Sequence, residues 1–141
     1  MSNLFKQMRE SIDAQTASAI ETVAARICDN MRDKLTADGH AGTGDLLNSI
    51  TYTRETSEDG KVSFVVGMNA YGRFIDQGTG AAHGGVREGY WRYKDRDGNW
   101  HTTNGMDADP FIDISTQDAM DGLSGILAER IEDAIKNLGK E

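Results

Sequence analysis

One helical stripe runs through the first 35 residues, and it constrains the fold more than any other feature of the sequence. Apolar side chains recur there at three- and four-residue steps, the spacing that places them on one face of an α-helix. They are Phe5, Met8, Ile12, Ile20, Val23, Ala24, Ile27, Met31 and Leu35. A helix from about Asn3 to about Leu35 would be roughly 45–50 Å long. Because the glycine-bearing run at residues 38–42 breaks the pattern, we expect one long N-terminal helix that is the main packing element.

Two β-hairpins are predicted in the middle of the chain. Segments 50–55 and 61–66 are rich in β-branched and aromatic residues, and the turn sequence Ser-Glu-Asp-Gly lies between them. Segments 90–95 and 100–103 flank an Asp-Gly-Asn turn and predict a second hairpin, which is polar on both faces. Such a hairpin buries little apolar area alone. We therefore expect residues 81–105 to project as an arm that becomes ordered against a neighbouring subunit.

A short aromatic turn lies between the two hairpins. Asn69 can cap this turn, and Tyr71, Phe74 and Ile75 share one side, which we expect to face the core. Gly78 can end the turn in a left-handed conformation that costs other residues energy. The turn then delivers the chain into a glycine-bearing loop.

Asp109 and Pro110 predict the start of the last helix, because Asp is a good N-cap and Pro is tolerated at the first helical position. Apolar residues then recur at helical spacing. They are Phe111, Ile112, Ile114, Met120, Leu123, Leu127, Ile131, Ala134, Ile135 and Leu138. Gly122 and Gly125 are unfavourable inside a helix, so a bend or a close helix contact is expected there.

These elements predict a single α+β domain over residues 1–141. In it, a small antiparallel sheet packs against a long N-terminal helix and a long C-terminal helix, with the projecting β-hairpin arm described above. The N-terminus has no apolar run after basic residues, and the chain has no stretch of eighteen apolar residues. We expect a soluble protein with neither a signal peptide nor a membrane partner. The single cysteine, Cys28, excludes an intramolecular disulfide and is expected to be a buried thiol in a reducing cytoplasm.

Charge is unevenly distributed along the chain. The formal net charge is −8, and residues 106–141 hold nine acidic and three basic residues. Phosphate binding needs clustered Lys and Arg, so we expect no sequence-specific nucleic-acid partner. Two interpretations of the acidic helix remain open: a solvated face, or a negative wall past which DNA slides. On the second, Asp118, Asp121 and Glu129 are candidates to face a channel.

Candidates for catalysis or metal binding are few. His40, His83 and His101 are the only histidines, and no Cys or second His stands beside them at a metal-ligand spacing. The serines lack a Gly-x-Ser-x-Gly setting, and the glycines at residues 78–80 lack the Lys-Ser/Thr of a phosphate loop. We therefore expect no catalytic residue, no cofactor and no metal. A three-histidine site, and with it a metal-dependent hydrolase, is kept as an alternative.

The arm holds the only local cue for nucleic-acid stacking. Arg92, Lys94 and Arg96 alternate there with Trp91 and Tyr93, while nearby acidic residues dilute the positive charge. Trp, Tyr and Arg are also the residues enriched in interface hot spots. We therefore favour a contact between subunits over nucleic-acid binding.

Three short motifs occur in a fixed order. They are Thr-Gly-Asp-Leu-Leu-Asn-Ser-Ile at residues 43–50, Tyr-Gly-Arg-Phe-Ile-Asp-Gln-Gly-Thr at residues 71–79 and Pro-Phe-Ile at residues 110–112. In this order and spacing they resemble the tail-completion, or head-tail joining, proteins of long-tailed bacteriophages, the gene-product-ten type of lambdoid phages. With its flanking helices the resemblance covers most of the chain. Two features depart from the family pattern: Asp76, where the family more often has Glu, and the polar insertion after Gly80.

The resemblance implies a structural virion protein rather than an enzyme. It implies a hexameric ring where the tail tube meets the head connector or stopper, completing the tail end and leaving a channel for DNA. The protein would assemble in the bacterial host cytoplasm and reside in the neck of the virion. Alternatives are a tail terminator that caps the tail tube, and a small cytoplasmic adaptor that binds another protein.

The candidate interface residues lie in the aromatic turn and in the arm. They are Tyr71, Phe74, Asp76, Gly78, Thr79, Gly80, Trp91, Arg92, Tyr93 and Trp100. The acidic C-terminal helix is expected to stay out of subunit contacts, because like-charged copies brought together would repel each other.

Overall fold

The computed structural model describes residues 2–78, 91–94, 97–103 and 107–138 of the chain. In chain order the elements are α1 (Ser2–Ala37), α2 (Asp45–Ser49), β1 (Thr51–Thr56), β2 (Val62–Gly67), α3 (Tyr71–Gln77), β3 (Trp91–Lys94), β4 (Trp100–Thr103), α4 (Phe111–Met120) and α5 (Leu123–Lys136).

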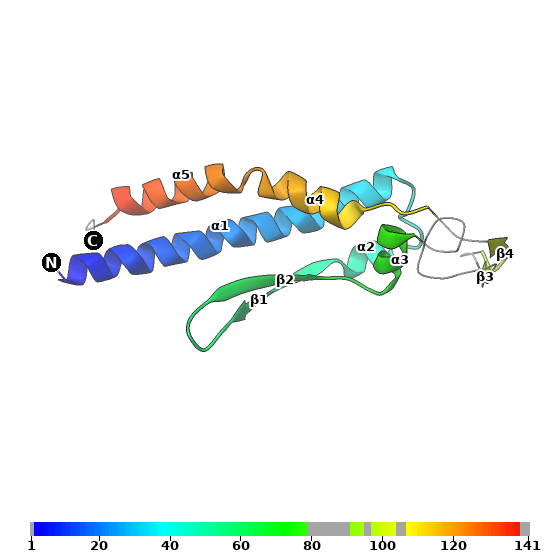
Figure 1. The fold of residues 1–141 in the computed structure, drawn as a ribbon, viewed down its shortest axis with the longest axis horizontal. Helices are drawn as coiled ribbons and strands as arrows, with labels where there is room; N and C mark the ends of the chain where they lie inside the picture. Colours follow the sequence, from blue (N-terminus) through cyan, green and yellow to red (C-terminus); the bar gives the residue numbers. More distant parts are fainter. Residues whose placement is uncertain (1, 79–90, 95–96, 104–106, 139–141) are drawn as a thin grey trace.

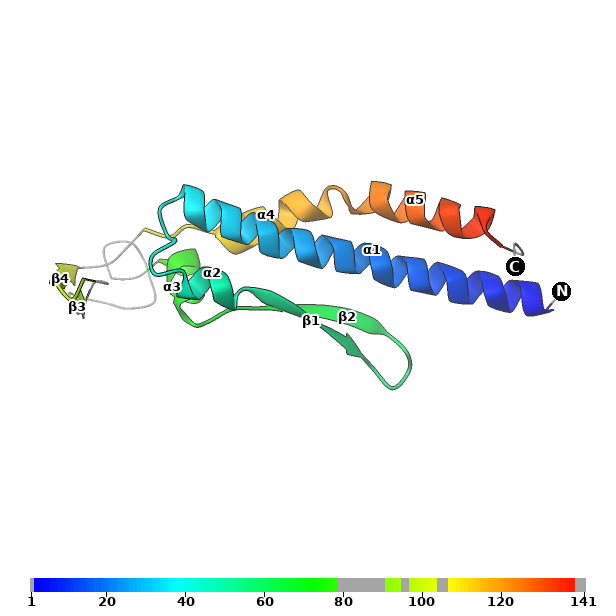
Figure 2. The same cartoon turned by 180° about the vertical axis from the view of Figure 1, so that it is seen from behind.

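The long helix α1 is the central layer of the molecule. Its 36 residues span about 54 Å at 1.5 Å per residue. Helices α4 and α5 run back along one side of α1, so that the end of α5 lies near the start of α1, and the β1–β2 hairpin lies along the other side (Figure 1). The view from behind shows the same three layers (Figure 2). The predicted α+β fold, with its small antiparallel sheet, its long N-terminal helix and its C-terminal helical segment, is confirmed. The sheet was expected to pack against both terminal helices, but it packs on α1, on the side opposite α4 and α5 (Figure 1).

The core lies beside the C-terminal half of α1. Its buried residues come from four helices and the junction between α2 and β1; they are Cys28, Met31, Leu35, Leu46, Ile50, Ile75 and Phe111. Cys28 is buried, as expected, and burial raises the pKa of its thiol. At the other end of α1, Leu4 and Phe5 are exposed. The packed core therefore lies at the C-terminal end of α1, and apolar side chains are exposed at its N-terminal end.

The first hairpin packs one face on α1. Its strands pair antiparallel from Thr51 opposite Gly67 to Thr56 opposite Val62. On the inner face, the rings of Tyr52 and Phe64 meet edge to face at 6.0 Å. Alternation along the strands leaves the outer face to solvent, as the period of a half-buried strand requires.

The predicted last helix is two helices with a break at Gly122, where a bend was expected. A methyl group at Gly122 would lie 3.4 Å from the guanidinium of Arg26, so this glycine permits a close approach of α1. On α5, Arg130 donates hydrogen bonds to the hydroxyls of Ser18 and Thr22 on α1, the second at 2.9 Å. These polar contacts supplement a modest apolar seam between α1 and α5.

The second hairpin pairs Trp91 with Thr103 and Lys94 with Trp100. Gly98, in its connection, has φ of +88°, a conformation that favours glycine. The hairpin lies beyond the end of the molecule where α2 and α3 are found, apart from the long helices (Figure 1). Within the described part of the chain, no helix is both long and apolar enough to cross a membrane.

Candidate functional site

The aromatic turn α3 is fixed to α2 by a chain of hydrogen bonds. The hydroxyl of Ser49 donates to the carbonyl of Leu46 at 2.6 Å and accepts from the backbone N–H of Asn69 at 3.0 Å. The Asn69 side-chain oxygen in turn accepts from the backbone N–H of Tyr71 at 3.1 Å. The predicted cap is therefore displaced by one residue: Ala70 occupies the cap position, and Asn69, one residue earlier, accepts the N–H of the first helical residue. The first and second sequence motifs are thus linked through Asn69.

The expectation that all three large residues of the turn face the core is wrong. Ile75 is fully buried, but Tyr71 is 53% exposed and Phe74 is 37% exposed. In a helix, residues three apart share a face. Here Gly72 and Ile75 form the buried pair, and Tyr71 and Phe74 form an adjacent exposed pair.

Gly72 explains how the turn packs so closely. A methyl group at this position would collide with the side chain of Met68 and would lie 3.4 Å from Leu46 Cδ1. A side chain at this position would therefore displace Met68, which packs against the turn. A glycine inside a short helix is the sequence signal for this packing.

Gly78 ends the turn with φ of +78° and ψ of 173°. The positive φ was expected, but the residue is extended rather than in the left-handed helical region. This part of conformational space is essentially restricted to glycine. Gly78 is also buried. Thr79 and Gly80, two further interface candidates, lie outside the described residues.

The segment that follows the arm lies beside the segment that precedes it. The backbone N–H of Asp109 donates to the carbonyl of Ile75 at 2.8 Å. One residue further, the Asp76 carboxylate accepts a hydrogen bond from the backbone N–H of Ile112 at 3.3 Å. The root of the arm is therefore closed by two hydrogen bonds between its outgoing and returning segments.

The predicted capping of the last helix by Asp109 is wrong by one residue. Helix α4 begins at Phe111, Pro110 occupies the cap position, and no side chain of the cap residue bonds to the helix. Instead, Asp76 from α3 supplies the acceptor for the start of α4. Asp76 takes the place of the local cap, because the carboxylate of Asp109 contacts Lys34 and His40 instead.

Asp109 belongs to a cluster of charged groups at the end of α1. Its carboxylate lies 3.5 Å from the ammonium of Lys34 and 3.4 Å from Nε2 of His40, while Lys34 also contacts Asp38 at 2.7 Å. Burial raises the pKa of Asp109 above its ordinary value, and the neighbouring Asp38 acts in the same direction. The hydrogen bond from Lys34 lowers the pKa of Asp38. The cluster fastens the returning end of the arm to α1.

Arg32 of α1 binds the C-terminal end of α2. Its guanidinium donates to the carbonyls of Leu47, at 3.3 Å, and Ile50, which lie in the last turn of α2 and at the cap residue that follows it. At the start of α2, Gly44 occupies the cap position with φ of +89°, and the Thr43 hydroxyl accepts a 3.4 Å bond from the Asp45 N–H. The role of Arg32 was not predicted, because nothing local in the sequence relates it to α2.

The remaining interface candidates lie on the arm. Trp91, Arg92 and Tyr93 belong to β3, and Trp100 belongs to β4. Trp100 is 59% exposed, and the ammonium of Lys94 lies 5.8 Å from the centre of its ring. The candidates therefore form two separate groups, one at the root of the arm and one on its hairpin.

The acidic candidates are exposed but do not share one groove. Asp118 lines a groove between α1 and α4, and Glu129 lines a different groove between α1 and α5. Asp121 lies at the break between α4 and α5. Among the described residues, no group of His, Cys, Asp and Glu is arranged to hold a metal ion. His83 lies outside the described residues.

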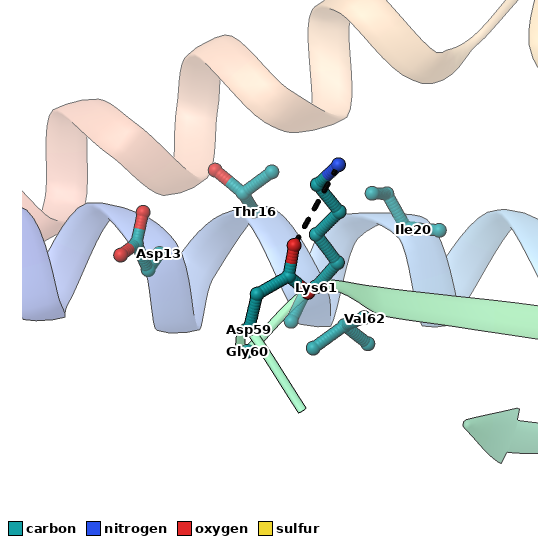
Figure 3. A pocket seen from close by; sticks show the side chains of 8 residues that line it. Asp13, Thr16, Ile20, Asp59, Gly60, Lys61 and Val62 are labelled. Atoms are coloured by element: carbon teal, nitrogen blue, oxygen red, sulfur yellow. Dashed lines mark ion pairs between the residues drawn. The ribbon is translucent and has the colours of Figure 1, made fainter. Parts of the chain in front are cut away.

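A further hollow of about 310 Å³ lies between the N-terminal half of α1 and the tip of the first hairpin (Figure 3). Thr16 and Ile20 line it from α1, and Val62 lines it from β2. At its rim, Lys61 pairs with Asp59 at 3.8 Å. An exposed pair of this kind contributes little to stability. We assign no chemistry to this hollow.

The comparisons with known proteins bear on the region just described. The family model described as "Bacteriophage HK97-gp10, putative tail-component" matches residues 1–94, which contain α1, the first hairpin, the aromatic turn and β3. The chain matches no curated protein and no solved structure. Because the family model covers well over half of its 141 residues, the chain belongs to the HK97-gp10-like family of bacteriophage tail components.

Proposed function

We propose that the protein forms a ring, of six subunits, at the head-tail interface of a phage or prophage virion. There it completes the tail end, joins it to the head connector and leaves a channel for DNA. Membership of a tail-component family supports a structural role over catalysis. Within the virion the protein would act mechanically, by matching the surfaces of its two partners.

The observation that carries this proposal is the set of contacts that hold together the two segments at the root of the arm. Hydrogen bonds from Asp109 to Ile75 and from Ile112 to Asp76 join the segments on either side of the arm, and an ionic contact links Asp109 to Lys34 of α1. Beside this root, Tyr71 and Phe74 present aromatic rings to solvent. Aromatic residues in such positions are the usual anchors of protein interfaces. A braced arm next to exposed anchors is suited to linking neighbouring subunits.

Charge supports passage of DNA without binding. The net charge is −8, and α5 carries Glu129 and Glu132 on exposed positions. A wall of like charge would repel the phosphate backbone. We propose Asp121 and Glu129 as the residues of the chain that face the channel.

Removal of the gene from its phage or prophage tests the proposed function. We expect filled heads and tails of normal length that fail to join, and we expect purified protein added to the lysate to restore joined particles. Tails of abnormal length would instead identify a tail terminator. Particles that form normally without the gene would overturn both functions.

Two variants sharpen this test. Phe74→Ala removes an exposed ring of the aromatic turn and should reduce the restored yield of joined particles. Ile135→Ala removes a similarly exposed apolar side chain from α5 and should restore particles as the parent protein does. Equal yields from the two variants would show that the aromatic turn is not an anchor.

A further inference from the structure

A groove of about 310 Å³ lies between α1 and α4, near the end of the molecule that carries the arm. Its apolar part is formed by Ala37 and Ile114, and Ile114 is 42% exposed. A half-exposed isoleucine in a groove offers apolar area that a bound side chain would remove from water.

The rim of the groove is acidic. Asp33 on α1 and Asp118 on α4 both line it and are exposed. Neither carboxylate forms an ion pair with another residue in the part of the chain that the structure describes. Lys34 is the basic residue of the groove lining, and its ammonium already contacts Asp38 and Asp109. The groove therefore suits an apolar side chain accompanied by a positive charge.

A buried polar group adds a second observation. Ser115 lines the groove and is 1% exposed, and its hydroxyl has no hydrogen-bond partner among the described residues. Buried polar groups are normally satisfied, so an unsatisfied one calls for an explanation. A donor brought into the groove would satisfy this hydroxyl after rotation about its Cα–Cβ bond.

The arm of this chain presents the matching chemistry. Trp100 is 59% exposed, and the ammonium of Lys94 lies 5.8 Å from the centre of its ring. The indole supplies a large apolar face, and the ammonium supplies the charge. In sequence, β3 carries Arg92 and Lys94 and no acidic residue.

We propose that the groove between α1 and α4 binds the Trp100 and Lys94 face of the arm of a second copy of this chain. The indole packs on Ile114 and Ala37, and the ammonium lies between Asp33 and Asp118. Groove and arm are at the same end of the molecule (Figure 1), so the contact joins neighbours that lie side by side. The contact joins two different surfaces, the groove of one subunit and the arm of the next. A head-to-tail contact of this kind generates a ring when the successive rotations between subunits return to the first subunit.

The proposed contact rests on the proposed ring function and refines it. It also changes two expectations from the sequence. Helix α4 takes part in subunit contacts instead of staying out of them, and Asp118 faces a neighbour instead of a channel. Its negative charge is offset by a basic residue of the neighbouring arm, so repulsion between like-charged helices does not arise at this place.

Four full-length variants test the contact by native mass measurement. One double variant, Trp100→Ala with Lys94→Glu, alters the arm. A second double variant, Ile114→Glu with Asp118→Lys, alters the groove. We expect each to weaken self-association more than about tenfold. Ile135→Glu and Asp133→Lys make the same changes at exposed positions of α5 and should assemble as the parent does.

Mixing the arm variant with the groove variant gives the sharpest result. Each retains one intact half of the contact, so we expect a heterodimer from the mixture, no further growth, and no dimer from either variant alone. Assembly of the groove variant like the parent, or absence of the heterodimer, would overturn the contact. Loss of assembly in the α5 controls to the same extent would also overturn it. If parent rings persist in those cases, the proposed ring function stands without this contact.

The same variants also test whether the arm binds the groove of its own chain or that of a neighbour. If the arm bound the groove of its own chain, Ile114→Glu would shift the tryptophan fluorescence of the monomer at high dilution. We expect no shift in the monomer and a blue shift of the parent on assembly, because the indole leaves water only when a neighbour binds. A shift in the dilute monomer would contradict the proposal.

Discussion

The Asp76 carboxylate accepts a hydrogen bond from the backbone N–H of Ile112, with 3.3 Å between the two atoms. The two residues stand on opposite sides of the arm, and the bond closes its root. It also places a negative charge at the N-terminus of α4, where the helix dipole favours one. The third sequence motif is therefore held by the second motif rather than by its own preceding aspartate.

Replacement of Asp76 by Ala should lower the free energy of unfolding by about 1 kcal/mol, the usual effect of losing a helix cap. Urea denaturation followed by circular dichroism measures this change. Asp76→Asn is the matched control, because the amide oxygen can still accept the bond, and it should cost less. An Ala variant as stable as the parent would show that the bond contributes nothing to the fold.

Because Ile75 is buried and Phe74 is partly exposed, substitution of these two neighbouring residues should change the free energy of unfolding by different amounts. Ile75→Ala removes a fully buried side chain and should cost about 2–5 kcal/mol of unfolding free energy. Phe74→Ala, at a 37% exposed position, should cost less than about 1 kcal/mol. Thermal melts of the two variants compare them directly. A larger loss from Phe74→Ala would mean that the ring, and not Ile75, anchors the turn.

Regular elements were predictable because their signals are local and repeated. The spacing of apolar residues from Phe5 to Leu35 defines α1 over many turns, and β-branched runs around a glycine turn define the first hairpin. The break at Gly122 followed from the low helix propensity of glycine. These predictions needed no knowledge of what each element packs against.

The arrangement of the site was less predictable, because partners distant in sequence replaced local ones. Asp109 suits a helix cap, but in the fold it contacts Lys34 and His40, and Asp76 takes the capping role. Short helices are also ambiguous, since a rotation of one residue exchanges Ile75 for Phe74 in the core. The observed rotation places Gly72 against the side chain of Met68, a contact that helical periodicity does not report.

Two glycines should respond oppositely to substitution by Ala. Gly78 has φ of +78°, so Gly78→Ala should lower stability by about 1–3 kcal/mol through backbone strain. Gly125 lies inside α5, and a methyl group there meets nothing within 4 Å. Gly125→Ala should therefore raise stability by up to about 1 kcal/mol. Chemical denaturation measures both; a neutral Gly78→Ala would contradict the observed backbone conformation.

The carboxyls of Asp38 and Asp109 should affect the pH dependence of stability with opposite signs. Lys34 holds the pKa of Asp38 below 3.8, so the stabilisation from charged Asp38 is present above that value and is lost as pH falls through the folded-state pKa. Burial and Asp38 hold the pKa of Asp109 above 3.8. Its contribution is therefore fully present below 3.8 and is lost as pH rises through the folded-state pKa.

Melting temperatures of two variants across the acid range check these signs. Asp38→Asn should melt below the parent at neutral pH, and the difference should shrink in acid as Asp38 of the parent becomes protonated. Asp109→Asn should melt at or above the parent at neutral pH and converge with it in acid. Equal losses from both variants at neutral pH would contradict the assignment of opposite pKa shifts.

The central claim is that this tail-family protein forms a closed ring through contacts made at the arm end of the molecule. Native mass measurement of the purified protein over a range of concentrations, combined with negative-stain imaging of the same samples, tests it most directly. The account predicts one ring of six subunits with an open centre, and loss of that ring in the arm and groove variants. A protein that remains monomeric at every concentration and shows no ring on purified tails would contradict it.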